Sequence, residues 1–294
     1  MKRPPEIQLK GAHVSDPVAA VTEAEATGET AALFADIRAV YGVSVVNLIW
    51  RHLATFPGAL PWAWGTVRPL YLSGAIAHEA AELRAARRLP TIPLVPAEVF
   101  AAVGLTKDDL HRIGTVLDAY ERTNPMALVA LSVLVQHLTD PPTLIASVQT
   151  QTPPIRDPDT DLRLPPLLRL DEMAPATAAL VLRLNRIGAA GSDPVLASMY
   201  RNLAHWPAYL ALAWTLLAPL EDGGGLSAAI RDTRDSATSR ARAIAAREPA
   251  PLPALPPTQR SAVADAIGRF TGDAICRMAV ICGILRGAGL SARA

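Results

Sequence analysis

The sequence predicts an all-α protein built from two tandem repeats of one multi-helix unit, which pack together as an internal pseudo-dimer. Apolar residues such as Leu33, Ile37 and Val40 recur at spacings of four and three, which is the spacing of one helix face. No long run alternates Val, Ile or Thr with polar residues, so no strand is predicted. The segment Val45–Tyr71 aligns without a gap to Val195–Glu221, 150 residues later, which indicates duplication.

The repeat is convincing because arginine, proline and tryptophan residues coincide in register. Upstream of the aligned block, Leu180, Leu184 and Ile187 repeat the helical spacing of the first copy at an offset of 147 residues. The coincident pairs within the block include Arg51/Arg201, Pro57/Pro207, Trp64/Trp214 and Pro69/Pro219. We expect both tryptophans of the pair to be mostly buried at equivalent places between helices.

Proline and capping residues divide the chain into helices of ordinary length. Pro57 and Pro207 are expected where one helix ends and the next begins, because proline is tolerated in a first turn but not inside a helix. Thr106, followed by Asp109, is a typical helix start. The domain organisation predicted from these signals is a first repeat over 1–140, a Pro-rich connector over 141–170, and a second repeat over 171–294.

Charge and composition exclude several classes of protein. The 28 basic residues nearly balance the 27 acidic ones, so nothing indicates a nucleic-acid partner. The uncharged stretch Asn202–Leu220 contains His205 and Pro207 and is predicted to form two buried helices rather than a membrane span. No secretory signal is recognised, and a cytoplasmic location is expected. Cys276 and Cys282, six residues apart on a helix, should point in different directions and serve as core residues.

Few motifs in this chain carry chemistry by themselves. There is no Gly-rich phosphate loop, and the histidines are scattered. The segment His78–Glu82 has the beginning of a zinc-helix motif but lacks the second histidine that such a site needs. Neither a metal nor another cofactor is therefore expected.

Three segments, His52–Trp64, Thr123–Leu131 and Ser198–Ala218, resemble the α-helical 2-haloacid dehalogenases, the group that handles both enantiomers. The resemblance implies a helical pseudo-dimer with the active site between its repeats. It also implies hydrolysis of small 2-halocarboxylic acids without an ester intermediate. In that family an Asp activates a water that attacks the halogen-bearing carbon directly, and an Asn helps to hold that water and the substrate.

Two catalytic positions of the family can be located by their neighbours. Asn124, in the pair Asn124-Pro125, matches the water- and substrate-positioning Asn of the family. The family's Asp follows a Ser that stands eight residues before a Trp-Pro step, and here that Ser is Ser198. The residue after it is Met199, whose thioether cannot accept a proton from water. The resemblance therefore places the general base at a position where this chain has lost it.

The pocket around these positions also departs from the family pattern. Val45 and Leu48 replace a Trp and a Phe, and Ile267 replaces a Tyr. The resemblance gives six substrate-binding candidates: Val45, Leu48, Tyr120, Ser198, Ile267 and Phe270. Glu121 stands three residues before Asn124 and would share its helix face, which makes it the candidate for a relocated base.

Three functions remain open at this point. The first is a 2-haloacid dehalogenase that uses a relocated base and acts on a small carboxylic acid. The second is a non-catalytic helical pseudo-dimer that binds a small, apolar ligand or has only a structural role. The third is a different enzyme that uses Asn124, Glu121 or Arg122. A homodimer is also left open. A cavity between Asn124 and Met199, and any carboxylate that reaches it, would distinguish these hypotheses.

Overall fold

The computed structural model describes residues 18–43, 45–139, 164–246 and 255–289. Within these residues the secondary structure is helical, and no strand is formed, which confirms the predicted all-α class. Of the predicted connector over 141–170, residues 141–163 lie outside the described residues.

The helices of the first half are α1 (Gly28–Tyr41), α2 (Leu48–Leu53), α3 (Ala59–Leu72), α4 (Ala75–Ala86), α5 (Ala97–Ala102) and α6 (Lys107–Thr139). The second half begins with a 3-10 turn, η1 (Leu170–Glu172). It continues with α7 (Pro175–Leu184), α8 (Ser198–Leu203), α9 (Pro207–Leu217), α10 (Pro219–Asp222), α11 (Gly225–Ala245) and α12 (Pro257–Arg269). A π-helical turn, η2 (Phe270–Ala274), then leads into α13 (Ile275–Gly287).

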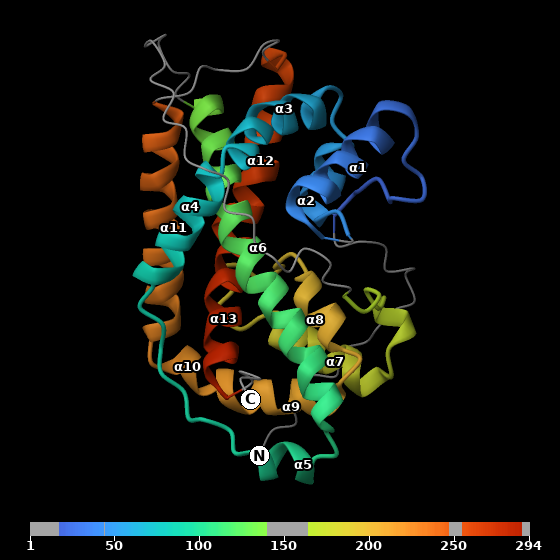
Figure 1. Cartoon of the computed structure of the whole chain (residues 1–294), viewed down its shortest axis with the longest axis vertical. Coiled ribbons are helices and arrows are strands. Elements are labelled where there is room, and N and C mark those ends of the chain that lie inside the picture. Colours follow the sequence, from blue (N-terminus) through green and yellow to red (C-terminus); the bar gives the residue numbers. More distant parts are fainter. Residues whose placement is uncertain (1–17, 44, 140–163, 247–254, 290–294) are drawn as a thin grey trace.

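The long helix α6 forms the centre of the molecule (Figure 1). It packs along α13 and α11, and α4 lies against it as well. The short helices pack in two smaller groups beside this bundle, with α1 against α3 and α7 against α9. One continuous apolar core runs through all of these groups.

The local signals of the sequence act as expected. Thr106 and Asp109 form a reciprocal cap at the start of α6: the Thr106 hydroxyl accepts the Asp109 N–H, and the Asp109 carboxylate accepts the Thr106 N–H. Pro207 is the first residue of α9, and Pro57 lies between α2 and α3. No helix of the described residues is long and apolar enough to cross a membrane.

Two predictions about single residue types have different outcomes. Cys276 and Cys282 are free and buried, and their thiols donate to the carbonyls of Ile230 and Leu117. Trp64 is 1% exposed, as expected, but Trp214 is only partly buried. Trp64 is one member of an aromatic cluster with Tyr41, Trp50 and Tyr71, whereas Trp214 belongs to no ring contact among the described residues.

Candidate functional site

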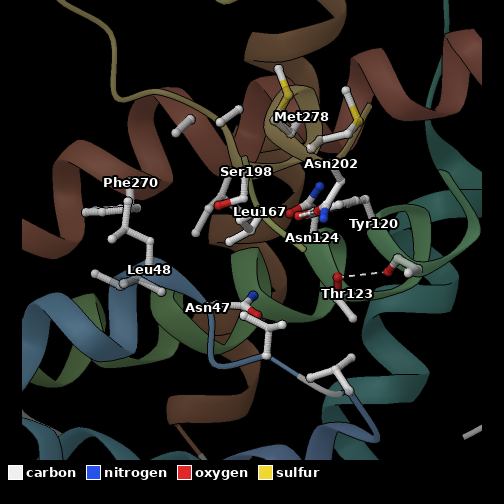
Figure 2. Close-up of a pocket in the computed structure, with 18 of the residues that line it drawn as sticks. Asn47, Leu48, Tyr120, Thr123, Asn124, Leu167, Ser198, Asn202, Phe270 and Met278 are labelled. Carbon is white, nitrogen blue, oxygen red and sulfur yellow. Dashed lines mark hydrogen bonds between the residues drawn. The ribbon is translucent and has the colours of Figure 1, made fainter. Parts of the chain in front are cut away.

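A small pocket lies where the two halves of the chain meet (Figure 2). Its walls come from the starts of α2 and α8, the middle of α6, the π-helical turn η2 and the first turn of α13. Leu164 and Leu167 close one side. The cavity has a volume of about 90 Å³. This is less than the roughly 150 Å³ of an engineered cavity that binds benzene, so the pocket suits a molecule of only a few heavy atoms.

Both long helical walls are irregular at the pocket. Proline at position 125 cannot donate a backbone N–H, so the helix α6 lacks one hydrogen bond beside Asn124. On the opposite wall the chain between α12 and α13 forms the π-helical turn Phe270–Ala274. Such turns are rare and are frequently found at functional sites. The irregular backbone places Asn124 and Phe270 at the cavity.

The structure brings together seven of the nine residues that the sequence singled out. Those seven line the pocket: Val45, Leu48, Tyr120, Asn124, Ser198, Met199 and Phe270. Met199 is fully buried, and Asn124 is 6% exposed. The cavity therefore lies at the place expected from the sequence, between Asn124 and Met199.

Glu121 and Ile267 do not line the pocket. The carboxylate of Glu121 forms an ion pair with Arg87, whose guanidinium also donates to the carbonyl of Ala279 on α13. The side chains of both partners are nearly buried, at 4% and 13% exposure for Arg87 and Glu121. Glu121 therefore does not reach the pocket, because this ion pair holds its carboxylate against Arg87, and the geometry lends no support to a relocated base at this position. Ile267 is fully buried in the core on α12.

A hydrogen-bonded chain crosses one end of the pocket. The Tyr120 hydroxyl donates to Oδ1 of Asn202 at 2.6 Å, and Nδ2 of Asn202 donates to the carbonyl of Pro165 at 2.6 Å. Burial raises the pKa of Tyr120 well above its ordinary value, so its hydroxyl stays protonated at neutral pH. No motif in the sequence marked Asn202 as part of the pocket wall.

Asn124 is the polar group with unused hydrogen-bonding capacity. Its Nδ2 atom is buried and has no hydrogen-bond partner among the described residues. A buried amide left unpaired costs about 1–3 kcal/mol, and native structures rarely tolerate such groups. Because Asn124 lines the cavity, a bound molecule could accept this hydrogen bond.

The rest of the wall is uncharged and mostly apolar. Among the described residues, none of the lining side chains is Asp, Glu, His, Lys, Arg or Cys. Asn47, Thr123 and Met278 line the pocket as well, although no sequence motif marked them. Nor do the described residues contain a cluster of three or more His, Cys, Asp or Glu that could hold a metal ion.

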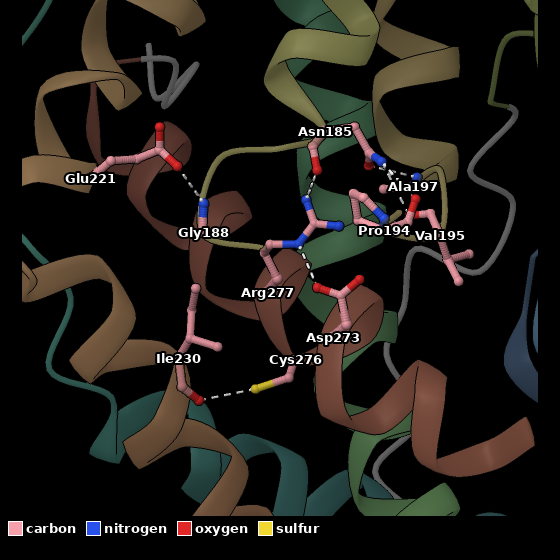
Figure 3. A network of polar contacts seen from close by, with 10 residues as sticks. All are labelled: Asn185, Gly188, Pro194, Val195, Ala197, Glu221, Ile230, Asp273, Cys276 and Arg277. Atoms are coloured by element: carbon pink, nitrogen blue, oxygen red, sulfur yellow. Dashed lines mark hydrogen bonds and ion pairs between the residues drawn. The ribbon is translucent and has the colours of Figure 1, made fainter. Parts of the chain in front are cut away.

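The loop between α7 and α8, which leads into Ser198 and Met199, is held by a buried arginine (Figure 3). Arg277 on α13 is fully buried, pairs with Asp273 at 3.2 Å and donates to the carbonyl of Asn185. The side chain of Asn185 in turn donates to the carbonyls of Pro194 and Val195 and accepts the N–H of Ala197. Arg277 thus connects two walls of the pocket, since Asp273 belongs to the π-helical turn.

A wider cleft of about 650 Å³ adjoins the pocket and shares Val45, Leu167 and Leu196 with it. Arg51, Arg169 and Arg201 are among its lining residues, together with Glu23 and Glu25. The shared residues separate this charged cleft from the uncharged pocket.

The described residues thus form an all-helical fold around a small pocket without charged lining side chains. A configuration-inverting 2-haloacid dehalogenase of Alcaligenes xylosoxydans xylosoxydans is 28% identical over 202 residues, which are 68% of each chain. A D-2-haloacid dehalogenase mutant solved with D-2-CPA superposes with a TM-score of 0.70 and 19% identity, over 92% of this chain and 94% of that one. A D-2-haloacid dehalogenase solved with L-LA superposes with a TM-score of 0.71 and 18% identity, over 96% of this chain and 99% of that one.

No family model matches the chain. The solved structures agree with it in fold, and the sequence relative establishes homology. The chain is a homologue of the 2-haloacid dehalogenases, as the resemblance of its motifs implied.

Proposed function

We propose that this chain is a diverged member of the 2-haloacid dehalogenase family that binds a small molecule in its pocket without hydrolysing a carbon–halogen bond. The observation that carries the proposal is the composition of the pocket wall. Of the described lining residues, only Tyr120 is ionisable, and burial keeps it protonated.

The chemistry of the family requires a base. A water that attacks a saturated carbon must lose a proton, and the acceptor has to be basic near neutral pH. Met199 lies on the pocket wall at the expected position, but its thioether is not such a group. Loss of one general base typically costs about 10²–10⁴ in rate. With no second base on the described wall, hydrolysis should be negligible.

The competing functions have less support. A relocated base at Glu121 would require its ion pair with Arg87 to break. Arg122, which a different enzyme could use, does not line the pocket and donates to the carbonyl of Gly42. A purely structural role would favour a filled core, whereas the chain keeps an open cavity with a buried, unpaired amide at Asn124.

The binding site would lie on the axis of an internal pseudo-twofold. Helices begin at positions that differ by 147 or 150 residues: Gly28 and Pro175, Leu48 and Ser198, Ala75 and Gly225, Lys107 and Pro257. The packing is reciprocal, because α6 contacts α8 while α12 contacts α2. In a twofold arrangement such contacts occur in pairs. This supports repeats over 1–140 and 171–294, joined by a connector over 141–170.

Halide release is the direct test of the proposal. We expect purified wild-type protein to release no halide above background from either enantiomer of 2-chloropropionate. Wild-type turnover at the rates of an ordinary enzyme would refute the proposal, and its loss in Glu121→Gln would then identify the base. Met199→Asp, with Met199→Leu as its matched control, asks whether a carboxylate alone is sufficient. We expect little gain in rate, because burial would raise the pKa of that carboxyl.

A further inference from the structure

The two ends of the pocket differ in polarity (Figure 2). Tyr120 and Asn124 from α6 meet Ser198 and Asn202 from α8 at one end. Leu48 and Phe270 lie together at the other.

The polar and apolar groups occupy matching positions in the two halves of the chain. At an offset of 150 residues, Tyr120 corresponds to Phe270, Asn124 to Ala274, and Ser198 to Leu48. All six residues line the cavity. Each of these three polar residues therefore has an apolar counterpart that also lines the pocket, and the proposed duplication has given one site with two chemically different ends.

Much of the hydrogen-bonding capacity at the polar end is already used. Tyr120 donates to Asn202, and Asn202 donates to the carbonyl of Pro165. Nδ2 of Asn124 remains as a donor that has no partner in the part of the chain that the structure describes. A ligand that satisfies it must present a hydrogen-bond acceptor, such as a carbonyl oxygen.

The lack of charged side chains on the described wall distinguishes between two kinds of small carbonyl compound, carboxylates and neutral carbonyls. A carboxylate would have to leave water for a wall on which no described side chain is cationic. An uncompensated buried charge is far more costly than a buried neutral carbonyl that is hydrogen-bonded. A neutral amide or ketone therefore fits the described walls better than an acid.

We propose that the pocket selects a small neutral carbonyl compound, with its oxygen on Asn124 Nδ2 and a short branched alkyl group against Leu48 and Phe270. This inference rests on the proposed binding function. It differs from the family's chemistry, since the ligand is uncharged and carries no leaving group.

Isobutyramide and isobutyrate form a matched pair of probes, because they have the same alkyl group and nearly the same shape. Methyl resonances of ¹³C-labelled methionine report binding at the site, since Met199 and Met278 line the pocket. Met173, which is buried but does not line it, serves as an internal reference. We expect isobutyramide to shift the Met199 and Met278 signals and isobutyrate to bind at least about tenfold more weakly.

Asn124→Leu removes the donor at similar size and should weaken isobutyramide binding by about three- to tenfold. Gln136→Leu makes the same exchange of an amide on α6 outside the pocket and should leave binding unchanged. If Asn124→Leu does not fold, the comparison of isobutyramide with isobutyrate on the wild-type protein still tests the inference. Equal or tighter binding of isobutyrate, or no shift with either compound, would overturn the inference. Halide release tests the proposed function separately.

Discussion

Gly188 lies in the loop between α7 and α8, whose last residues line the pocket. It is the position in this loop where substitution should have the largest effect. It has a φ of +70°, and its N–H donates to Glu221 at 3.1 Å. An added Cβ would lie 2.8 Å from Cδ1 of Ile230 and 3.3 Å from Cδ2 of Leu226. Gly188→Ala should therefore suffer both backbone strain and overpacking. Gly104, with a φ of +81° and open space around it, isolates the first effect.

The magnitudes of the two effects follow from these contacts. A left-handed conformation costs a non-glycine residue about 1–2 kcal/mol. Overpacking adds about 1–3 kcal/mol, at the low end here because the end of the Ile230 side chain can move. The lower entropy of the unfolded Ala chain offsets about 0.4–1 kcal/mol in both variants. We expect Gly188→Ala to lose about 2 kcal/mol and Gly104→Ala about 1 kcal/mol.

Urea unfolding followed by circular dichroism measures both variants. The midpoint should fall with an unchanged slope, which indicates lost stability rather than a changed unfolded state. Equal losses in Gly188→Ala and Gly104→Ala would refute the reasoning. Such a result would mean that the loop can move away from Ile230 without cost, so that the Asn185 and Arg277 network does not fix it.

Two further predictions concern buried side chains. Burial lowers the pKa of His137, so the unfolded chain binds a proton near pH 6.5 that the folded chain does not. The free energy of unfolding should therefore fall as the pH drops below about 6.5. His137→Gln should reduce this dependence, whereas His111→Gln, at an exposed position, should keep it. Equal pH dependence in wild type and His137→Gln would contradict the assignment. Trp64→Ala should lower stability by about 3–5 kcal/mol. Trp214→Ala should lower it less, because Trp214 is partly exposed, and the reverse order in urea would show the burial argument to be wrong.

The sequence predicts local features of this protein well, because they depend on neighbours in the chain. The cap of α6 needs only Thr106 and Asp109, and the start of α9 needs only Pro207. The helical class follows from spacing, and seven of the pocket residues follow from the family motifs. Trp214 shows the limit of repeat symmetry, since a position can be matched in sequence while its packing partners have changed.

Residues whose roles depend on distant partners could not be predicted in this way. Glu121 shares a helix face with Asn124 on a regular helix, but the spacing does not reveal that Arg87 binds its carboxylate. Asn202 carries no catalytic signature, and only the folded chain places it beside Tyr120. The difference in polarity between the two ends of the pocket likewise arises only when both halves of the chain are in contact.

The π-helical turn Phe270–Ala274 makes the register of α13 sensitive to chain length. Each helical residue advances the chain by about 100°, so a deletion of one residue within this turn would rotate every later side chain by that angle. Ile275 and Met278 would then leave the pocket, and Arg277 would leave Asn185. Insertions and deletions here should change this site more than most substitutions, and a relative that lacks the extra residue would present a different helix face to its ligand.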